Sequence, residues 1–178
     1  MSATSDYRTE LIARLRATTD DLAWAVRGLP QQQYLWAPSA DEWSIHQHVA
    51  HLVDMEAQVY LPLLRWASVP DMLDPVDYSR RSWQAERYDP AQELGEFVSE
   101  LGRLRDEEFE VFRDLDDVTW TRLRRDTRWG PLTCRWIAEV VYRHALDHLQ
   151  GVMGLRGDIH LAAVHPEVVV GATIGGNA

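Results

Sequence analysis

Lysine is absent from the 178-residue sequence, and cysteine occurs once, as Cys134. A single cysteine excludes an internal disulfide and a zinc-ribbon framework, and it fits a reducing, cytoplasmic location. Arginine alone supplies the strongly basic side chains, and the formal net charge is −10 at pH 7. Such a chain is unsuited to nucleic acid or anionic lipid, because binding to either depends on neutralising phosphate groups with basic residues.

Long hydrophobic runs are also missing. No stretch approaches the ~20 apolar residues that a membrane-spanning helix needs, and residues 1–8 lack the apolar centre of a signal peptide. Apolar residues nevertheless make up 46% of the chain, which is typical of a globular protein. The length suits one domain with an adequate core.

Apolar residues recur at helical spacing in four stretches. They predict helices over residues 5–27, 44–67, 89–113 and 133–155, with Pro62 kinking the second helix or ending it early. Ser44 and Gln47 form a capping box at the second start, and Asp89-Pro90 is expected to open the third helix.

This order of elements predicts an all-α fold, an antiparallel four-helix bundle with a long crossover connection at about residues 68–88. The loop at 116–132 follows the third helix. We expect the bundle to occupy residues 1–157, ending at Gly157, and residues 158–178 to form a C-terminal tail that packs on the bundle or is partly mobile.

Two histidines in the last predicted helix are the strongest functional candidates. His144 and His148 are four residues apart, so they lie one turn above each other on a single helix face. That face is otherwise apolar, with Ile137, Val141 and Val152 among its members. Buried imidazoles need polar partners, and a divalent transition metal is one such partner. The alternative is that each histidine only hydrogen-bonds to a neighbour within the core.

A third ligand should come from the second helix, which carries His46, His48 and His51. Periodicity favours His48 slightly, because it lies nearer the centre of the apolar stripe, whereas His51 lies toward its edge and His46 on its flank. Asp54 and Glu56 are candidates for carboxylates that orient an imidazole, or are ordinary solvated charges.

Two motifs give the chain a family resemblance. One is Trp43-Ser44 opening a helix that reads His51-Leu-Val-Asp-Met-Glu56, and the other is His144-x-x-x-His148 followed by Leu-Gln-Gly151. With their order and separation, they resemble the DinB-like (DinB/YfiT) four-helix-bundle proteins across roughly residues 5–157. The resemblance implies a divalent metal held by His51, His144 and His148, which conflicts with the slight preference for His48 from periodicity.

Three histidine ligands leave coordination positions for water or substrate, as in catalytic zinc sites. Zinc or nickel is expected, and iron also fits, because imidazole ligands do not select among these metals. Family members look like transferases or isomerases that use a low-molecular-weight thiol such as mycothiol, or like metal-dependent hydrolases. We therefore expect a thiol-dependent S-transferase or isomerase acting on a small electrophile, with a hydrolase or a non-catalytic binding bundle as alternatives.

Other residues are weaker candidates for a role in the site. An acidic thiol cofactor would need cations, and Arg143 and the loop residues Arg124, Arg125 and Arg128 are available, although solvated salt bridges are the simpler reading. Cys134 is about ten residues from His144 along the helix and is expected to pack in the core. The tail and the exposed tryptophans offer apolar surface for a homodimer.

Overall fold

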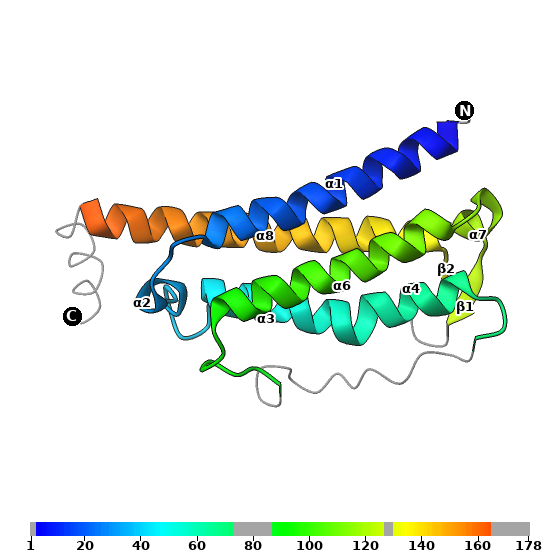
Figure 1. Ribbon diagram of the computed structural model, residues 1–178. Helices are drawn as coiled ribbons and strands as arrows, with labels where there is room; N and C mark the ends of the chain where they lie inside the picture. Colours follow the sequence, from blue (N-terminus) through cyan, green and yellow to red (C-terminus); the bar gives the residue numbers. More distant parts are fainter. Residues whose placement is uncertain (1–2, 73–86, 127–129, 165–178) are drawn as a thin grey trace, which may run out of the picture.

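Four long helical segments form the protein in the computed structural model, which describes residues 3–72, 87–126 and 130–164 (Figure 1). They are α1 (Ala3–Val26), α3 (Ile45–Met55) continued by a π-helical turn η1 (Glu56–Tyr60) and by α4 (Leu61–Ser68), α6 (Leu94–Asp114), and α8 (Cys134–Val164). The predicted all-α four-helix bundle is confirmed. None of the described helices is both long and apolar enough to cross a membrane.

Short elements close the ends of the bundle. These are α2 (Gln31–Tyr34), α7 (Asp117–Thr121) and an antiparallel pair of strands, β1 (Arg124–Asp126) and β2 (Gly130–Leu132). The loop that we expected at 116–132 therefore contains a helical turn and a small hairpin. Asp116 caps α7 by accepting a hydrogen bond from the Thr119 amide at 2.6 Å, a local signal that the sequence does carry.

The helices do not simply alternate in direction. Segment α3–η1–α4 and α6 run the same way, and α1 and α8 run opposite to both of them (Figure 1). Two successive long segments that share a direction agree with the predicted crossover connection, most of which lies outside the described residues. Helix α8 packs against α1, α3 and α4, and α3 also packs against α6.

The second long segment begins as predicted and then departs from regular geometry. Ser44 Oγ accepts from the Gln47 amide at 3.2 Å, and the Gln47 side chain accepts from the Ser44 amide at 2.8 Å, which completes the capping box. The interruption expected near Pro62 takes the form of the π-helical turn η1 just before it. Proline cannot donate to the carbonyl four residues earlier, so the helical register is free to change there.

Helix α6 starts later than predicted, at Leu94 instead of Asp89. Asp89 Oδ1 accepts from the Ala91 amide at 2.9 Å and thus closes a local turn, and it does not cap the helix. The Gln92 carbonyl accepts from His46 Nε2 at 2.8 Å. This tertiary hydrogen bond takes the carbonyl out of the helical ladder, which explains why the helix begins beyond it.

Helix α8 is longer than predicted and continues through Gly157 to Val164. The last predicted turn does not end the core contacts, because Leu155 is buried and Ile159, one turn later, still packs against a core cluster. The first residues of the expected tail are thus helical. The rest of that tail, residues 165–178, lies outside the described residues.

The core consists of two clusters of buried side chains with a gap between them along α8. One cluster includes Tyr60, Ile137 and Val141, and the other includes Leu52 and Val152. Ile137, Val141 and Val152, which the sequence placed on the apolar face of the last helix, are buried. The intervening turns of α8 carry His144 and His148, so the polar site lies where the apolar core is interrupted.

Candidate metal centre

Helices α3 and α8 bring three histidines together at this interruption. His51, His144 and His148 each offer one ring nitrogen, and the three nitrogens all lie within 4.8 Å of one another. Ring centroids are 4.5 Å apart for His144 and His148, and 5.3 Å and 5.1 Å from His51 to these two. The set drawn from distant parts of the chain is the one that the family resemblance implied.

The donor atoms fit a small cation. Nε2 of His144 and Nε2 of His148 are 3.0 Å apart. Two imidazole nitrogens bound to one tetrahedral zinc ion, each at about 2.0–2.1 Å, are separated by about 3.3 Å, so little movement is needed. Nδ1 of His144 is buried without a hydrogen-bond partner among the described residues. These nitrogens are therefore better explained as ligands of a divalent transition metal than as members of a closed hydrogen-bond network.

Burial keeps these imidazoles unprotonated. Desolvation in the first place, and neighbouring histidines in addition, lower the pKa of His51 and of His144 to about 4 and that of His148 to about 3. For His51 the nearby carboxylate of Asp54 acts in the opposite direction. Neutral imidazole is the form that binds a metal, so the site presents its donors ready at neutral pH.

His46, the first histidine of α3, has a structural role. It is fully buried, and its Nδ1 lies 2.7 Å from the Tyr88 hydroxyl while Nε2 lies 2.8 Å from the Gln92 carbonyl oxygen. A carbonyl can only accept, so Nε2 carries the proton and the Tyr88 hydroxyl donates to Nδ1. Both ring nitrogens are thereby satisfied within the protein.

His48 lies beside the three histidines and outside the set whose nitrogens converge. Its Nδ1 is 2.8 Å from Nδ1 of His148, and burial lowers its pKa. The geometry thus brings His51, and not the His48 that periodicity slightly favoured, to the shared position. Periodicity ranked the two by their distance from the apolar stripe of α3, whereas the shared position is decided by contact with the histidines of α8.

Two aromatic rings that the sequence analysis did not assign to the site enclose it. Trp43 precedes α3 and packs on three histidines, with centroids 5.5 Å, 4.9 Å and 5.7 Å from those of His48, His51 and His148. Tyr60, from the π-helical turn, lies 5.6 Å from His144. The proximity of Trp43 to the capping box was visible in the sequence, whereas the contact of Tyr60 with His144 joins two distant helices and has no local sequence signal.

The two acidic candidates of the second helix behave differently. Asp54 accepts from Arg87 through both carboxylate oxygens, at 2.8 Å and 3.1 Å, and its charge acts on His51. Glu56 is fully buried and points to α6, where Arg105 Nη2 lies 2.6 Å from its Oε1. Of the two, Asp54 is therefore the one that influences the histidine set directly.

A buried charge cluster, Glu56–Arg105–Glu108, lies close to Tyr60. All three side chains are at most 2% exposed, and Arg105 Nη1 donates to Glu108 at 2.9 Å. Burial raises the pKa of Glu56 well above its usual range, although Arg105 opposes this. One proton on the two carboxyls leaves the cluster neutral. Sequence periodicity could not reveal this cluster, because the pattern of residue types does not distinguish a buried charged side chain from an exposed one.

Two arginines near the hairpin, Arg122 and Arg124, are engaged by backbone carbonyls. Arg122 donates to the carbonyls of Ala67 and Ser68, and Arg124 donates to the Trp66 and Val69 carbonyls and lies over the Trp66 ring at 4.0 Å. These two side chains close the C-terminus of α4. Arg143 is exposed on α8, Arg125 is exposed on β1, and Arg128 lies outside the described residues.

Cys134 packs in the core, as expected. Its side chain is fully buried and burial raises the pKa of its thiol to about 11, so burial outweighs the effect of the helix N-terminus. His160 is exposed on the last turns of α8.

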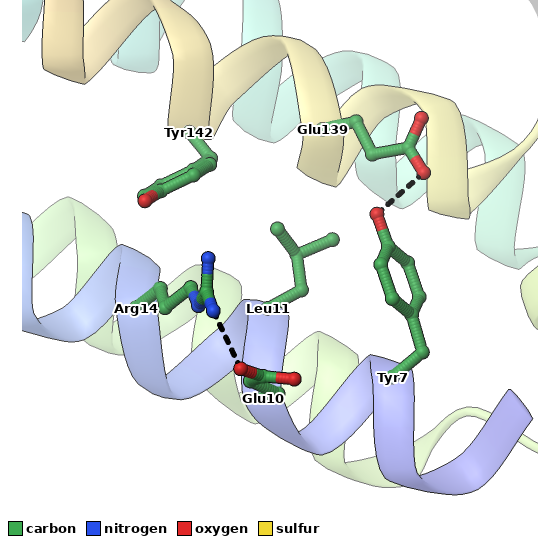
Figure 2. Close-up of a pocket in the computed structure, with 6 residues that line it drawn as sticks. All are labelled: Tyr7, Glu10, Leu11, Arg14, Glu139 and Tyr142. Atoms are coloured by element: carbon green, nitrogen blue, oxygen red, sulfur yellow. Dashed lines mark hydrogen bonds and ion pairs between the residues drawn. The ribbon is translucent and has the colours of Figure 1, made fainter. Parts of the chain in front are cut away.

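A surface groove of about 200 Å³ lies between α1 and α8, and none of the residues that line it is a histidine (Figure 2). Its polar groups satisfy one another: the Tyr7 hydroxyl donates to Glu139 at 2.8 Å, and Arg14 pairs with Glu10 at 2.6 Å. The groove therefore offers no strong recognition of a ligand, and the histidine set is the better candidate for function.

The fold and this site define a class: a four-helix bundle with a candidate metal centre of three neutral histidines on two of its helices. Within that class the chain belongs to the DinB superfamily, whose family model matches residues 14–151. No curated protein matches the sequence.

Solved structures show the same fold. YfiT from Bacillus subtilis, described as a probable metal-dependent hydrolase with an unusual four-helix bundle topology, is 16% identical, with a TM-score of 0.76 over 90% of both chains. A mutant of the mycothiol-dependent maleylpyruvate isomerase is 13% identical, with a TM-score of 0.65 over 84% of this chain and 62% of its own. At these identities the likeness establishes the architecture.

Proposed function

We propose that the protein is a metalloenzyme that holds one divalent cation through His51, His144 and His148. The observation that carries this proposal is the convergence of the three ring nitrogens within 4.8 Å, in a setting that keeps them unprotonated. Zinc or nickel is expected, and iron is the next candidate, because three imidazoles do not select among these ions.

The residues around the histidines do the work of positioning and exclusion. Trp43 covers His51 and His148, and Tyr60 flanks His144, so both rings limit the access of bulk water. His51, His144 and His148 would hold the cation, which would supply Lewis acidity for activating a thiol or water. Asp54 places negative charge near His51, which strengthens an imidazole as a donor.

For the reaction, we propose thiol-dependent S-transfer or isomerisation of a small electrophile, with a low-molecular-weight thiol such as mycothiol as the co-substrate. Support comes from the three-ligand donor set and from the fold shared with the mycothiol-dependent maleylpyruvate isomerase. Cys134 is excluded as the nucleophile, because its thiol is fully buried and its pKa is raised.

Two measurements test this proposal. Elemental analysis of the purified protein should find about one zinc, nickel or iron per chain, and a His144→Ala, His148→Ala variant should lose it. Thiol consumption with model electrophiles should then require both the metal and the histidines. Equal thiol consumption by the wild-type protein and the His144→Ala variant would refute S-transfer, and absence of bound metal after loading would refute the metal centre.

Hydrolysis is the second candidate. It is supported by the shared fold with YfiT, a probable metal-dependent hydrolase, and by Arg124, which is engaged at the end of α4 and is therefore not free to bind an acidic thiol. Turnover of an ester or amide panel in the absence of thiol, lost in the His144→Ala variant, would favour it over S-transfer. Metal binding with neither activity would favour a non-catalytic binding bundle.

The location and partners stay predictions. We expect a cytoplasmic protein that acts on a small molecule, binds neither nucleic acid nor membrane, and forms a homodimer. A monomer mass at all concentrations in light scattering would overturn the last of these.

A further inference from the structure

We infer that His48 is a positioning residue that fixes the orientation of His148 through a hydrogen bond between imidazoles, and that Gly151 provides the space for the His48 ring. This inference rests on the proposed metal centre, because it assigns to His48 the orientation of one of its three ligands. Neither the family match nor the shared fold assigns a role to these two residues.

The first step is the hydrogen bond itself. Nδ1 of His48 and Nδ1 of His148 are 2.8 Å apart, while Nε2 of His148 faces Nε2 of His144 at 3.0 Å. A histidine that binds a metal through Nε2 keeps its proton on Nδ1. His148 therefore donates from Nδ1, and His48 accepts at Nδ1 and carries its own proton on Nε2.

Metal-binding histidines usually donate their second ring nitrogen to a carboxylate, a carbonyl or water, and this partner fixes the tautomer and the ring orientation. In this protein a neutral imidazole takes that place. It adds no charge to the site, and its ring plane limits the directions from which it can accept.

The second step is the notch at Gly151. A Cβ at this position would lie 2.6 Å from Cε1 and 2.9 Å from Nε2 of His48, closer than side chains tolerate. Glycine in the middle of a helix is less favourable than alanine. The contact explains why α8 carries glycine here: the backbone of α8 must approach the His48 ring closely for the hydrogen bond to His148 to form.

The contact with Gly151 also indicates that His48 orients a metal ligand and is not a ligand itself. Nδ1 of His48 is used by His148, and Nε2 lies against Gly151 on α8. His48 thus has no nitrogen directed at the position that His51, His144 and His148 share. Trp43 contacts both rings, in a T-shaped arrangement with His48 and a stacked one with His148.

Side-chain substitutions test the role of His48 through the affinity for zinc alone, measured by chelator competition. Asparagine keeps an acceptor, Oδ1, at the place of Nδ1, whereas alanine removes it. We expect His48→Ala to weaken zinc binding about 10- to 100-fold and His48→Asn to restore most of the loss. Unfolding curves of the metal-free variants show whether each one folds.

Substitution of the glycine tests the same idea from the opposite helix. Gly151→Ala should favour the helix but displace the His48 ring, so zinc binding should weaken although the helix is not disrupted. Combined with His48→Asn, which lacks Cε1 and Nε2, the alanine should fit, and the affinity should return toward that of His48→Asn. Gly154→Ala, which has no heavy atom within 4 Å of the added carbon, is the matched control and should bind zinc like the wild type.

Nitrogen-15 NMR of the zinc-loaded protein provides a readout that a purely structural role would not change. We expect a proton on Nδ1 of His148 and on Nε2 of His48, with zinc on Nε2 of His148. A zinc-bound nitrogen in His48, or unchanged affinity in both His48→Ala and Gly151→Ala, would overturn the inference while leaving the metal centre intact. Absence of zinc binding by the wild-type protein would overturn both.

Discussion

The buried cluster Glu56–Arg105–Glu108 allows a sharp prediction about stability. Replacing Arg105 with methionine removes the cation that faces two carboxyls, one 2.6 Å and the other 2.9 Å from the guanidinium nitrogens. Since all three side chains are at most 2% exposed, water cannot replace the lost partner. Breaking a buried ion pair from one side typically costs about 3–5 kcal/mol.

The free energy of binding a proton gives a second estimate of how far the substitution lowers the free energy of unfolding. Charge balance with one arginine favours a single proton on the two carboxyls, in the direction in which burial shifts the pKa of Glu56, and the variant must bind one more proton to avoid an uncompensated buried charge. Protonating an ordinary glutamate at pH 7 costs about 3.7 kcal/mol, from a pKa of about 4.3 at about 1.36 kcal/mol per unit. At pH 5 the same step costs only about 1 kcal/mol.

We therefore expect Arg105→Met to lower the free energy of unfolding by about 3–4 kcal/mol at pH 7 and by about 1 kcal/mol at pH 5. The sign follows from linkage: the folded variant binds a proton that the unfolded chain releases above pH 4–5, so its stability relative to the wild type falls as pH rises. Urea unfolding at a series of pH values, with the metal removed, measures the difference.

A control lies on the same helix. Arg103 is paired with Glu100 and Glu107 but is 55% exposed, so Arg103→Met should change stability by no more than about 0.5 kcal/mol at either pH. Glu56→Gln should also be mild, because an amide resembles the protonated carboxyl it replaces. A loss below about 1 kcal/mol at pH 7 in Arg105→Met, or a loss that does not depend on pH, would refute the buried-cluster argument.

Further predictions concern the cap, the thiol and the histidines. Ser44→Ala should cost about 1 kcal/mol in unfolding free energy, because it removes the capping box; an unchanged midpoint would contradict this. Cys134 should react with a thiol reagent only after unfolding, since it is buried and its pKa is about 11; rapid labelling of the native protein would count against the packing. The metal-free protein should lose stability as pH falls from about 6.5 toward 4, because the unfolded chain takes up protons that buried His51, His144 and His148 resist; calorimetry should show a falling Tm in that window. Zinc at 100 times its dissociation constant should stabilise the fold by about 2.7 kcal/mol, and no shift in Tm would argue against specific binding.

Local signals in the sequence were sufficient for much of the fold. The periodicity of α1, α6 and α8 identified their buried faces, and the Ser44–Gln47 capping box marked the start of α3. Local signals failed where a distant residue intervened. Asp89 is a suitable cap residue, but the Gln92 carbonyl accepts a hydrogen bond from His46 and α6 begins after it. Helix α8 continues past Gly157 because Ile159 still packs against the core.

The sequence by itself determined the chemistry available to the site: two imidazoles one turn apart on an apolar helix face, three more histidines on the second helix, and no competing cysteine cluster. Only the tertiary structure decided which nitrogens meet. Packing of α3 against α8 brings His51 to the shared position and places the His48 ring against Gly151. Spacing along one helix fixes the face on which a residue lies, but the angle of that face toward another helix depends on contacts that the linear sequence does not contain.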